Sequence, residues 1–207
     1  MNVFRSFLKI ILDLLEIAFI GIAVFILVYA FIGQPMQVTG DSMYPTLHDG
    51  DQIIAEKVST HVTSLKRGDV VIFKSPVDNV TPIIKRVIGL PGDVIYLKNN
   101  KVYVNDSALD EPYVYGMTFS DQLSSLSPYI VDGNSYFVMG DNRENSRDSR
   151  VWGAISNNSI LGKGFVIFFP FNRIRLVDTI YSMEHLTKVF TNVIGEIKLT
   201  IGDFAYF

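Results

Sequence analysis

The chain contains no cysteine among its 207 residues. This absence excludes a thiol nucleophile, a disulfide framework and thiolate metal sites, and it is compatible with a location outside the cytoplasm. Histidine is also scarce, because only His48, His61 and His185 are present, and none has a metal-ligand spacing such as HxxxH. We therefore predict no metal and no cofactor, and we expect each histidine at the surface.

The chain also lacks a surplus of basic residues. Its formal net charge is -3, which removes the electrostatic attraction that supplies most affinity for nucleic acid, so nucleic acid is not a predicted partner. Hydrophobic residues make up 48% of the chain, and the mean hydropathy is +0.27. This content indicates a membrane segment, and the length suffices for one core or for one core with a small insertion.

Charge is missing from Ile17 through Gly40. An apolar run of roughly 20 residues is enough to cross about 30 Å of hydrocarbon, so we predict a single transmembrane helix within residues 1–35. Arg5 and Lys9 precede this run, whereas the next basic residue after Lys9 is Lys57. The asymmetry predicts a cytoplasmic N-terminus and a chain that continues outside the cell membrane.

The same N-terminal pattern is also compatible with a cleaved signal peptide. A basic start, an apolar run and the small residues around Val28-Tyr29-Ala30 resemble an export signal. The apolar run is long and bulky for such a signal, so the anchor is the preferred interpretation.

Beyond Pro35, which should end the helix, alternating apolar residues predict short strands. Two apolar runs flank the polar turn Asn99-Asn100 and predict a hairpin over residues 94–104. The predicted fold class is mainly β, with an antiparallel catalytic domain over residues 36–177 and a short irregular insertion at about 105–134. Further strands are expected at 36–39, 52–57, 70–74, 135–139, 151–155 and 164–169.

The C-terminal tail, residues 178–207, shows a different pattern. Apolar residues recur at helical spacing from Met183 to Ile197, which predicts an amphipathic helix. Packing on the domain and contact with a membrane surface both remain open for it.

One loop has the composition of a nucleophile-bearing turn. Ser42 lies between Gly40, which permits close approach of backbone, and Pro45, which fixes the following turn. Alone, this cluster of turn residues would indicate only a loop. Two later segments change that interpretation: Lys85 directly follows apolar residues of a strand, and residues 140–150, GDNRENSRDSR, are dense in short hydrogen-bonding side chains.

These segments resemble, in order and spacing, the signature boxes of bacterial type I signal peptidases. The matching stretches are SMYPTL, GDVVIF, KRVIGLPGD and GDNRENSRDSR, which together lie within residues 40–150. The resemblance implies a membrane-bound endopeptidase that uses a Ser-Lys dyad to remove signal peptides from exported preproteins after an Ala-x-Ala-like site. Its expected partners are those signal peptides and membrane lipid.

By this resemblance, Ser42 is the nucleophile and Lys85 the general base, which must be neutral and hence buried to act. Ser146 should hydrogen-bond the Lys85 amine, and an Asp148–Arg150 ion pair should hold the loop that carries Ser146. The Ser42 backbone N–H is the expected oxyanion donor. A second donor is unassigned, because Gly40 stands where some relatives have a serine, a departure that resembles the Gram-positive branch.

The substrate is expected to bind as an added strand between residues 36–41 and 83–85. Small apolar pockets suit an Ala-x-Ala ending, and the residues expected to line them are Val38, Met43, Leu47 and Ile84.

Three other classes of protein share parts of this pattern. A self-cleaving Ser-Lys repressor would have a DNA-binding domain in place of the apolar N-terminus. A catalytically silent relative would lack Ser42 or Lys85, and both are present. A peptidase dedicated to pilin-like or other special precursors stays open.

Overall fold

The computed structural model of the protein describes residues 2–27, 33–57, 64–119 and 128–177. Within these residues the fold is mainly β, and every pair of neighbouring strands is antiparallel, as predicted. The predicted tail helix lies outside the described residues.

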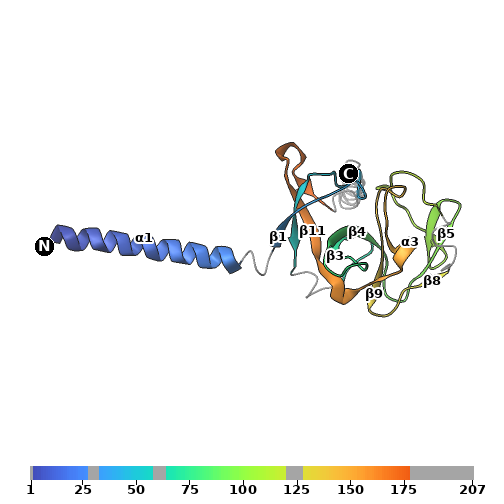
Figure 1. Cartoon of the computed structure of the whole chain (residues 1–207), viewed down its shortest axis with the longest axis horizontal. Coiled ribbons are helices and arrows are strands. Elements are labelled where there is room, and N and C mark those ends of the chain that lie inside the picture. Colours follow the sequence, from blue (N-terminus) through green and yellow to red (C-terminus); the bar gives the residue numbers. More distant parts are fainter. Residues whose placement is uncertain (1, 28–32, 58–63, 120–127, 178–207) are drawn as a thin grey trace, which may run out of the picture.

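The larger sheet carries eight strands in the order β1-β2-β11-β3-β4-β9-β10, with β12 paired to β11 (Figure 1). Its strands are β1 (Gly33–Gln37), β2 (Gln52–Glu56), β3 (Val70–Lys74), β4 (Pro82–Gly89), β9 (Ser135–Met139), β10 (Ile155–Ser156), β11 (Ile160–Phe169) and β12 (Arg175–Leu176).

Strand β4 lies inside this sheet and separates two apolar clusters. Its Ile84 packs with Val38 and Met43 on one side, whereas Ile83 packs with the cluster that includes Trp152 on the other. Side chains that are neighbours in a strand point to opposite faces, which explains the division. Residues 82–86 pair with β3, but β9 pairs only with residues 86–89. Among the described strands, one edge of residues 82–85 is therefore open.

The smaller sheet has the order β7-β6-β5-β8 and lies beside the larger one (Figure 1). The predicted hairpin is confirmed, because Asn99 and Asn100 both have positive φ angles, 51° and 59°, which a tight two-residue turn requires. The strands are β5 (Val94–Lys98), β6 (Lys101–Val104), β7 (Ser107–Ala108) and β8 (Tyr129–Ile130).

In its described residues the predicted insertion at about 105–134 is irregular apart from the two short strands β7 and β8, but it is not separate from the core. Tyr113 and Val131 are buried against Ile95 and Phe137 and help to form the core of the smaller sheet. The sequence does not indicate this packing, because a few apolar residues spaced without a period give no local signal that they contact the apolar face of β5 and β6.

The strand predicted at residues 151–155 is wrong. A short helix, α3 (Ser149–Trp152), stands there instead, and β10 begins only at Ile155. The Asp148 side chain accepts a hydrogen bond from the Arg150 N–H and caps this helix, and Gly153 ends it with a φ of 81°. Two 3-10 turns, η2 (Asn157–Ser159) and η3 (Phe171–Arg173), flank β11.

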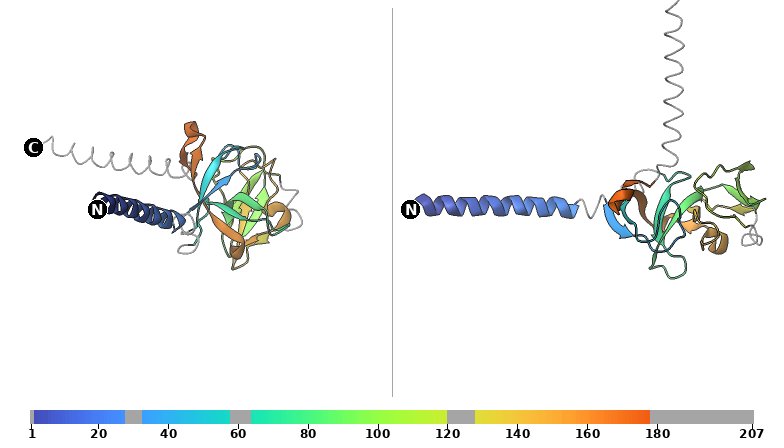
Figure 2. Two further views of the ribbon diagram at one scale, coloured as in Figure 1. Left: turned by 60° about the vertical axis from the view of Figure 1, so that its left-hand side comes forward. Right: turned by 90° about the horizontal axis from the view of Figure 1, so that it is seen from above.

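The N-terminal segment is helical but differs from the prediction at its end. Helix α1 (Asn2–Leu27) extends away from the sheets in both views of Figure 2. Pro35 does not end the helix but lies in β1, an edge strand of the sheet, where a missing N–H is tolerated. In the described part of the chain, no helix combines the length and apolar character needed to span a membrane.

Candidate active site

The loop that carries Ser42 is held by buried anchors on both sides. Met43 and Leu47 are buried in the core, and the Leu47 N–H donates to the Met43 carbonyl across one helical turn. Before the loop, Val38 exchanges backbone hydrogen bonds with Gly50 and Asp51. These contacts present Ser42, which is half-buried, at the end of the open edge of β4.

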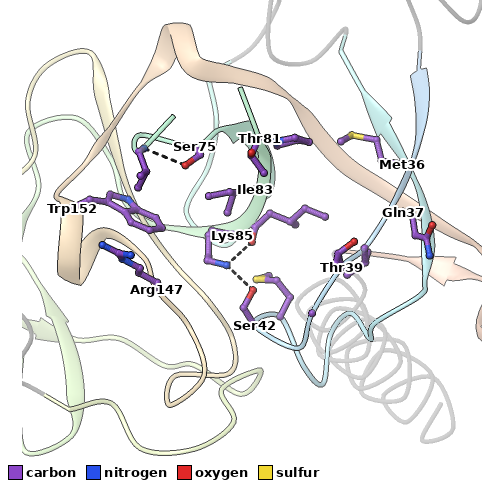
Figure 3. Close-up of a pocket in the computed structure, with 16 residues that line it drawn as sticks. Met36, Gln37, Thr39, Ser42, Ser75, Thr81, Ile83, Lys85, Arg147 and Trp152 are labelled. Carbon is purple, nitrogen blue, oxygen red and sulfur yellow. Dashed lines mark hydrogen bonds between the residues drawn. The ribbon is translucent and has the colours of Figure 1, made fainter. Parts of the chain in front are cut away.

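Lys85 reaches this serine from β4. Its Nζ lies 2.6 Å from the Ser42 Oγ and 3.0 Å from the Ile84 carbonyl oxygen (Figure 3), although only 3% of the residue is exposed. Burial lowers the pKa of Lys85 from 10.5 to about 8, because an ammonium loses hydration there. The nearby carboxylates of Asp148 and Asp141 oppose this shift, and Arg150 adds to it.

Ser146 does not contact Lys85 by a hydrogen bond, which differs from the expectation. Its hydroxyl donates to the Asp148 Oδ2 at 2.7 Å, whereas the described hydrogen bonds of the Lys85 amine go to Ser42 and Ile84. A carboxylate is the stronger acceptor for a hydroxyl proton, which accounts for this choice.

The expected pair of Asp148 and Arg150 is present in the structure. The Arg150 Nε and Nη2 lie 2.8 Å and 2.9 Å from the two oxygens of Asp148, and Nη2 also donates to the carbonyls of Arg143 and Ser146. Asp148 further accepts from the Gly140 N–H at 3.0 Å. The pair thus links several backbone groups of the loop 140–150 and holds the Ser146 side chain in position.

A second buried ion pair, which the sequence analysis missed, joins this loop to β4. Arg86 donates to Asp141 through Nε at 2.8 Å and Nη2 at 2.6 Å, and its Nη1 donates to the Gly68 carbonyl. The guanidinium also lies 4.1 Å from the centre of the Tyr113 ring. The signal available in the sequence was the basic residue next to Lys85, but nothing there named its partner 55 positions away.

A third pair connects the same loop to the insertion. Arg143, which is buried, forms an ion pair with Glu111 and donates to the Thr118 hydroxyl at 2.8 Å. Three buried ion pairs therefore hold the loop 140–150: one within the loop, one to β4 and one to the insertion.

A pocket of about 620 Å³ opens beside Ser42 and Lys85, between β1 and β4 (Figure 3). Three of the residues expected to bind substrate, Val38, Met43 and Ile84, line it. Leu47 does not, because it is fully buried in the core below the loop. Two residues that were not expected, Arg147 and Trp152, form part of the pocket wall.

The Ser42 N–H donates to none of the groups in the described residues. It is therefore available to an oxyanion beside the Ser42 hydroxyl. The geometry of the described residues does not single out a second hydrogen-bond donor for the oxyanion, so this donor stays unassigned.

This arrangement can activate a hydroxyl. A buried amine with a lowered pKa is partly neutral near pH 8, and in that form its nitrogen can accept the Ser42 proton over the observed 2.6 Å. The chemistry that follows is attack of the serine oxygen on a carbonyl carbon.

Comparison with known proteins identifies the family of the chain. A family described as "Signal peptidase, peptidase S26" matches residues 11–169. Signal peptidase I S of Bacillus subtilis (strain 168) is 37% identical over 175 residues, which is 81% of this chain and 94% of that protein. Signal peptidase I of Bacillus licheniformis is 38% identical over 169 residues, covering 77% and 89%.

A crystal structure of a signal peptidase I from Enterococcus faecalis V583 shares 29% identity and covers 49% of this chain and 97% of that chain, with a TM-score of 0.43. The sequence matches define the class as hydrolases that remove signal peptides. The chain belongs to the peptidase S26 family and is a serine endopeptidase of the type I signal peptidase group, on its Gram-positive-like branch.

Proposed function

We propose that Ser42 and Lys85 form the catalytic dyad with which this enzyme cuts signal peptides from preproteins. The observation that carries the proposal is the 2.6 Å contact between the Lys85 Nζ and the Ser42 Oγ at a buried position. With a pKa of about 8, Lys85 is neutral in about a tenth of the molecules at pH 7, against far fewer than a hundredth for an ordinary lysine.

Acylation begins when the neutral Lys85 amine takes the Ser42 proton. The serine oxygen bonds to the carbonyl carbon of the scissile peptide, and the oxyanion that forms accepts a hydrogen bond from the Ser42 N–H. Lys85, now an ammonium, donates its proton to the leaving amine as the C–N bond breaks. The mature protein departs, and the signal peptide stays bound to Ser42 as an ester.

Deacylation repeats these steps with water. Lys85 accepts a proton from a water molecule that attacks the ester, and it returns the proton to Ser42 as the C–O bond breaks. Ser146, Asp148 and Arg150 act as positioning residues, because they hold the loop against the dyad without touching the reacting atoms.

The substrate binds as an extended strand along the open edge of β4. Residues 82–85 offer unpaired backbone groups on that edge, and β1 pairs with β2 alone, so its other edge is also free in the described sheet. Side chains on alternate substrate positions then enter the wall formed by Val38, Met43 and Ile84, which suits small apolar residues such as alanine.

Helix α1 anchors the enzyme in the cell membrane, with the N-terminus in the cytoplasm and the catalytic domain outside. Its side chains are exposed on all faces and mostly apolar, from Phe7 to Ile26. The part of α1 from Ile17 onward carries no charge, and a helical segment that is apolar all round is stable when lipid or protein covers it. The basic residues at its start favour the cytoplasmic side for that end.

The test is cleavage of a labelled preprotein by the full chain in detergent, with the cut mapped by mass spectrometry. We expect one cut after an Ala-x-Ala ending, none with Ser42→Ala, and normal cleavage with Ser64→Ala, which removes an exposed serine hydroxyl elsewhere. Cleavage that survives Ser42→Ala would contradict the proposal.

A further inference from the structure

The wall of the pocket opposite Val38 and Met43 carries a positively charged side chain, Arg147, which the proposed reaction does not use. Arg147 lines the pocket that also contains Ser42 and Lys85, and Figure 3 shows its side chain beside Trp152 on the far side of Lys85 from Met36. The residue is exposed. It therefore meets the substrate channel rather than the protein core.

Arg147 differs from the other arginines of its loop because it has no acceptor. Arg143 pairs with Glu111 and Arg150 pairs with Asp148, whereas Arg147 makes no hydrogen bond or ion pair with any residue of the described part. The nearest carboxylate in sequence, Asp148, is fully buried and already accepts from Arg150, Ser146 and Gly140. The guanidinium is thus free to bind an anion.

Trp152 lies beside Arg147 and lines the same wall, although its indole Nε1 is buried (Figure 3). Its Nε1 is, among the described residues, the one buried side-chain nitrogen or oxygen without a hydrogen-bond partner. The guanidinium of Arg147 is therefore the exposed donor on this wall that lacks an acceptor, and it is complementary to a group that accepts hydrogen bonds.

The two faces of β4 indicate which substrate side chain would contact the wall formed by Arg147 and Trp152. In the binding mode proposed above, the residue that supplies the scissile carbonyl lies at Ser42, and its side chain enters the part of the pocket lined by Val38, Met43 and Ile84. Side chains alternate along an extended strand. The preceding residue, the second before the cut, therefore points to the Ile83 side, where Trp152 and Arg147 lie.

We propose that Arg147 determines specificity by binding a carboxylate side chain, Asp or Glu, on the second residue before the cleavage site. This inference rests on the proposed function, because it uses the same substrate strand. The Ala-x-Ala pattern does not define the residue at this middle position, and Arg147 would favour an acidic residue there. A guanidinium suits this task because its planar donors match the two oxygens of a carboxylate.

The size of the effect follows from the exposure of Arg147. Exposed ion pairs are weak, so the preference for Glu over Gln should be about twofold to fivefold in kcat/KM. It should also shrink as salt rises from about 0.05 M to 1 M, because the screening length falls to about 3 Å.

The experiment uses the full chain in detergent and peptide substrates that differ only at one position. One pair carries Glu or Gln at the second residue before the cut, and a control pair carries them at the second residue after it. The Glu/Gln ratio of kcat/KM is measured for the wild type, Arg147→Gln, Arg147→Lys and Lys101→Gln. The last variant removes an exposed positive charge on the smaller sheet.

We expect a ratio above one only at the position before the cut. It should fall to about one in Arg147→Gln, survive in part in Arg147→Lys, and stay unchanged in Lys101→Gln. Because each ratio compares two substrates of one preparation, a partly unfolded variant does not distort it.

A wild-type ratio of one, a ratio that Arg147→Gln leaves intact, or a preference at the position after the cut would each overturn the inference while the proposed function stands. Cleavage of neither peptide by the wild type would overturn the proposed function, and this inference with it.

Discussion

Gly140 lies where the two loops of the active site meet. A Cβ atom added there would lie 2.3 Å from the Ser146 Oγ and 2.5 Å from the Ser42 carbonyl oxygen. Real Cβ atoms do not approach other atoms so closely, and backbone cannot move aside as a flexible side chain can. The absence of a side chain at Gly140 therefore sets the distance between the Ser42 loop and the loop 140–150.

We predict that Gly140→Ala lowers both activity and stability. The added methyl group must push the two loops apart, so the free energy of unfolding should fall by about 1–3 kcal/mol. Turnover should fall about a hundredfold, because a shift of about 1 Å at a reacting group costs that much. Urea unfolding and peptide turnover measure the two effects. Gly133→Ala is the control, since a Cβ there meets nothing within 4 Å, and equal behaviour of both variants would contradict this explanation.

Lys85, the proposed general base, is costly to the stability of the fold. Burial lowers its pKa from 10.5 to about 8, so below pH 8 the folded protein must hold a charge that the unfolded chain exposes to water. Between these two values the unfolded state binds more protons than the folded state, and stability from this group rises with pH.

Lys85→Met should therefore raise the free energy of unfolding at pH 7 by roughly 1–3 kcal/mol while abolishing cleavage. The upper figure corresponds to the whole shift in pKa, and lost hydrogen bonds to Ser42 and Ile84 reduce it. The gain should shrink as pH rises from 8 towards 10.5. Urea titrations at pH 7 and pH 10 measure it, and a stability gain that is equal at both pH values would contradict the burial argument.

At the scale of elements, β4 connects the chemistry to the framework. Lys85 and Arg86 are neighbours on this strand, and one contacts Ser42 while the other holds Asp141 at the start of the loop 140–150. Both members of the Arg86–Asp141 pair are almost fully buried. A single strand thus fixes the positions of the serine loop and the supporting loop relative to each other.

Asp141→Asn should destabilise the fold by about 3–5 kcal/mol, because it removes the carboxylate that pairs with the buried Arg86 charge. The loss should appear as a lower urea midpoint with an unchanged slope. Lys163→Gln is the control, since its pair with Asp69 is more exposed and should contribute about 1 kcal/mol or less. Similar losses in both variants would contradict the role given to the buried pair.

The sequence predicts those elements whose signals are local. Strand β3 and the hairpin of β5 and β6 were predicted closely, because alternation and a polar turn lie within a few residues of each other. Helix α3 was missed because its cap, Asp148, had been assigned only to an ion pair with Arg150.

Site residues follow the same rule. Ser42 and Lys85 lie in short patterns, and the structure brings them together over 43 positions. Leu47 packs in the core and not in the pocket, because of the direction in which its turn faces. Arg86 pairs with Asp141 because the strand order brings β4 next to β9, which leads into the loop 140–150. Both are consequences of tertiary packing, which no local pattern contains.

For the whole molecule, the main question is how the catalytic domain meets a substrate at the membrane. Helix α1 and the sheets are joined near β1, whose other end leads towards the Ser42 loop (Figure 1). An anchor at this end would keep the substrate channel close to the surface where a signal peptide is embedded. The topology proposed above follows from this arrangement and from Arg5 and Lys9.

Protease added to intact spheroplasts should therefore digest the domain that follows α1. A cytoplasmic protein in the same cells should stay intact until lysis, which controls for leakage. Full protection of the domain before lysis would contradict an outward-facing site.

The central claim is that Lys85 is the neutral base that activates Ser42, and the pH dependence of kcat/KM tests it most directly. The wild-type profile should rise with pH through about 8 and then level off, because the enzyme gains activity as Lys85 loses its proton. Lys85→Arg stays charged at any workable pH and should lose roughly 10²–10⁴-fold in rate across the whole range. Near-normal turnover by Lys85→Arg, with a profile that matches the wild type, would contradict the account even if Ser42→Ala were inactive.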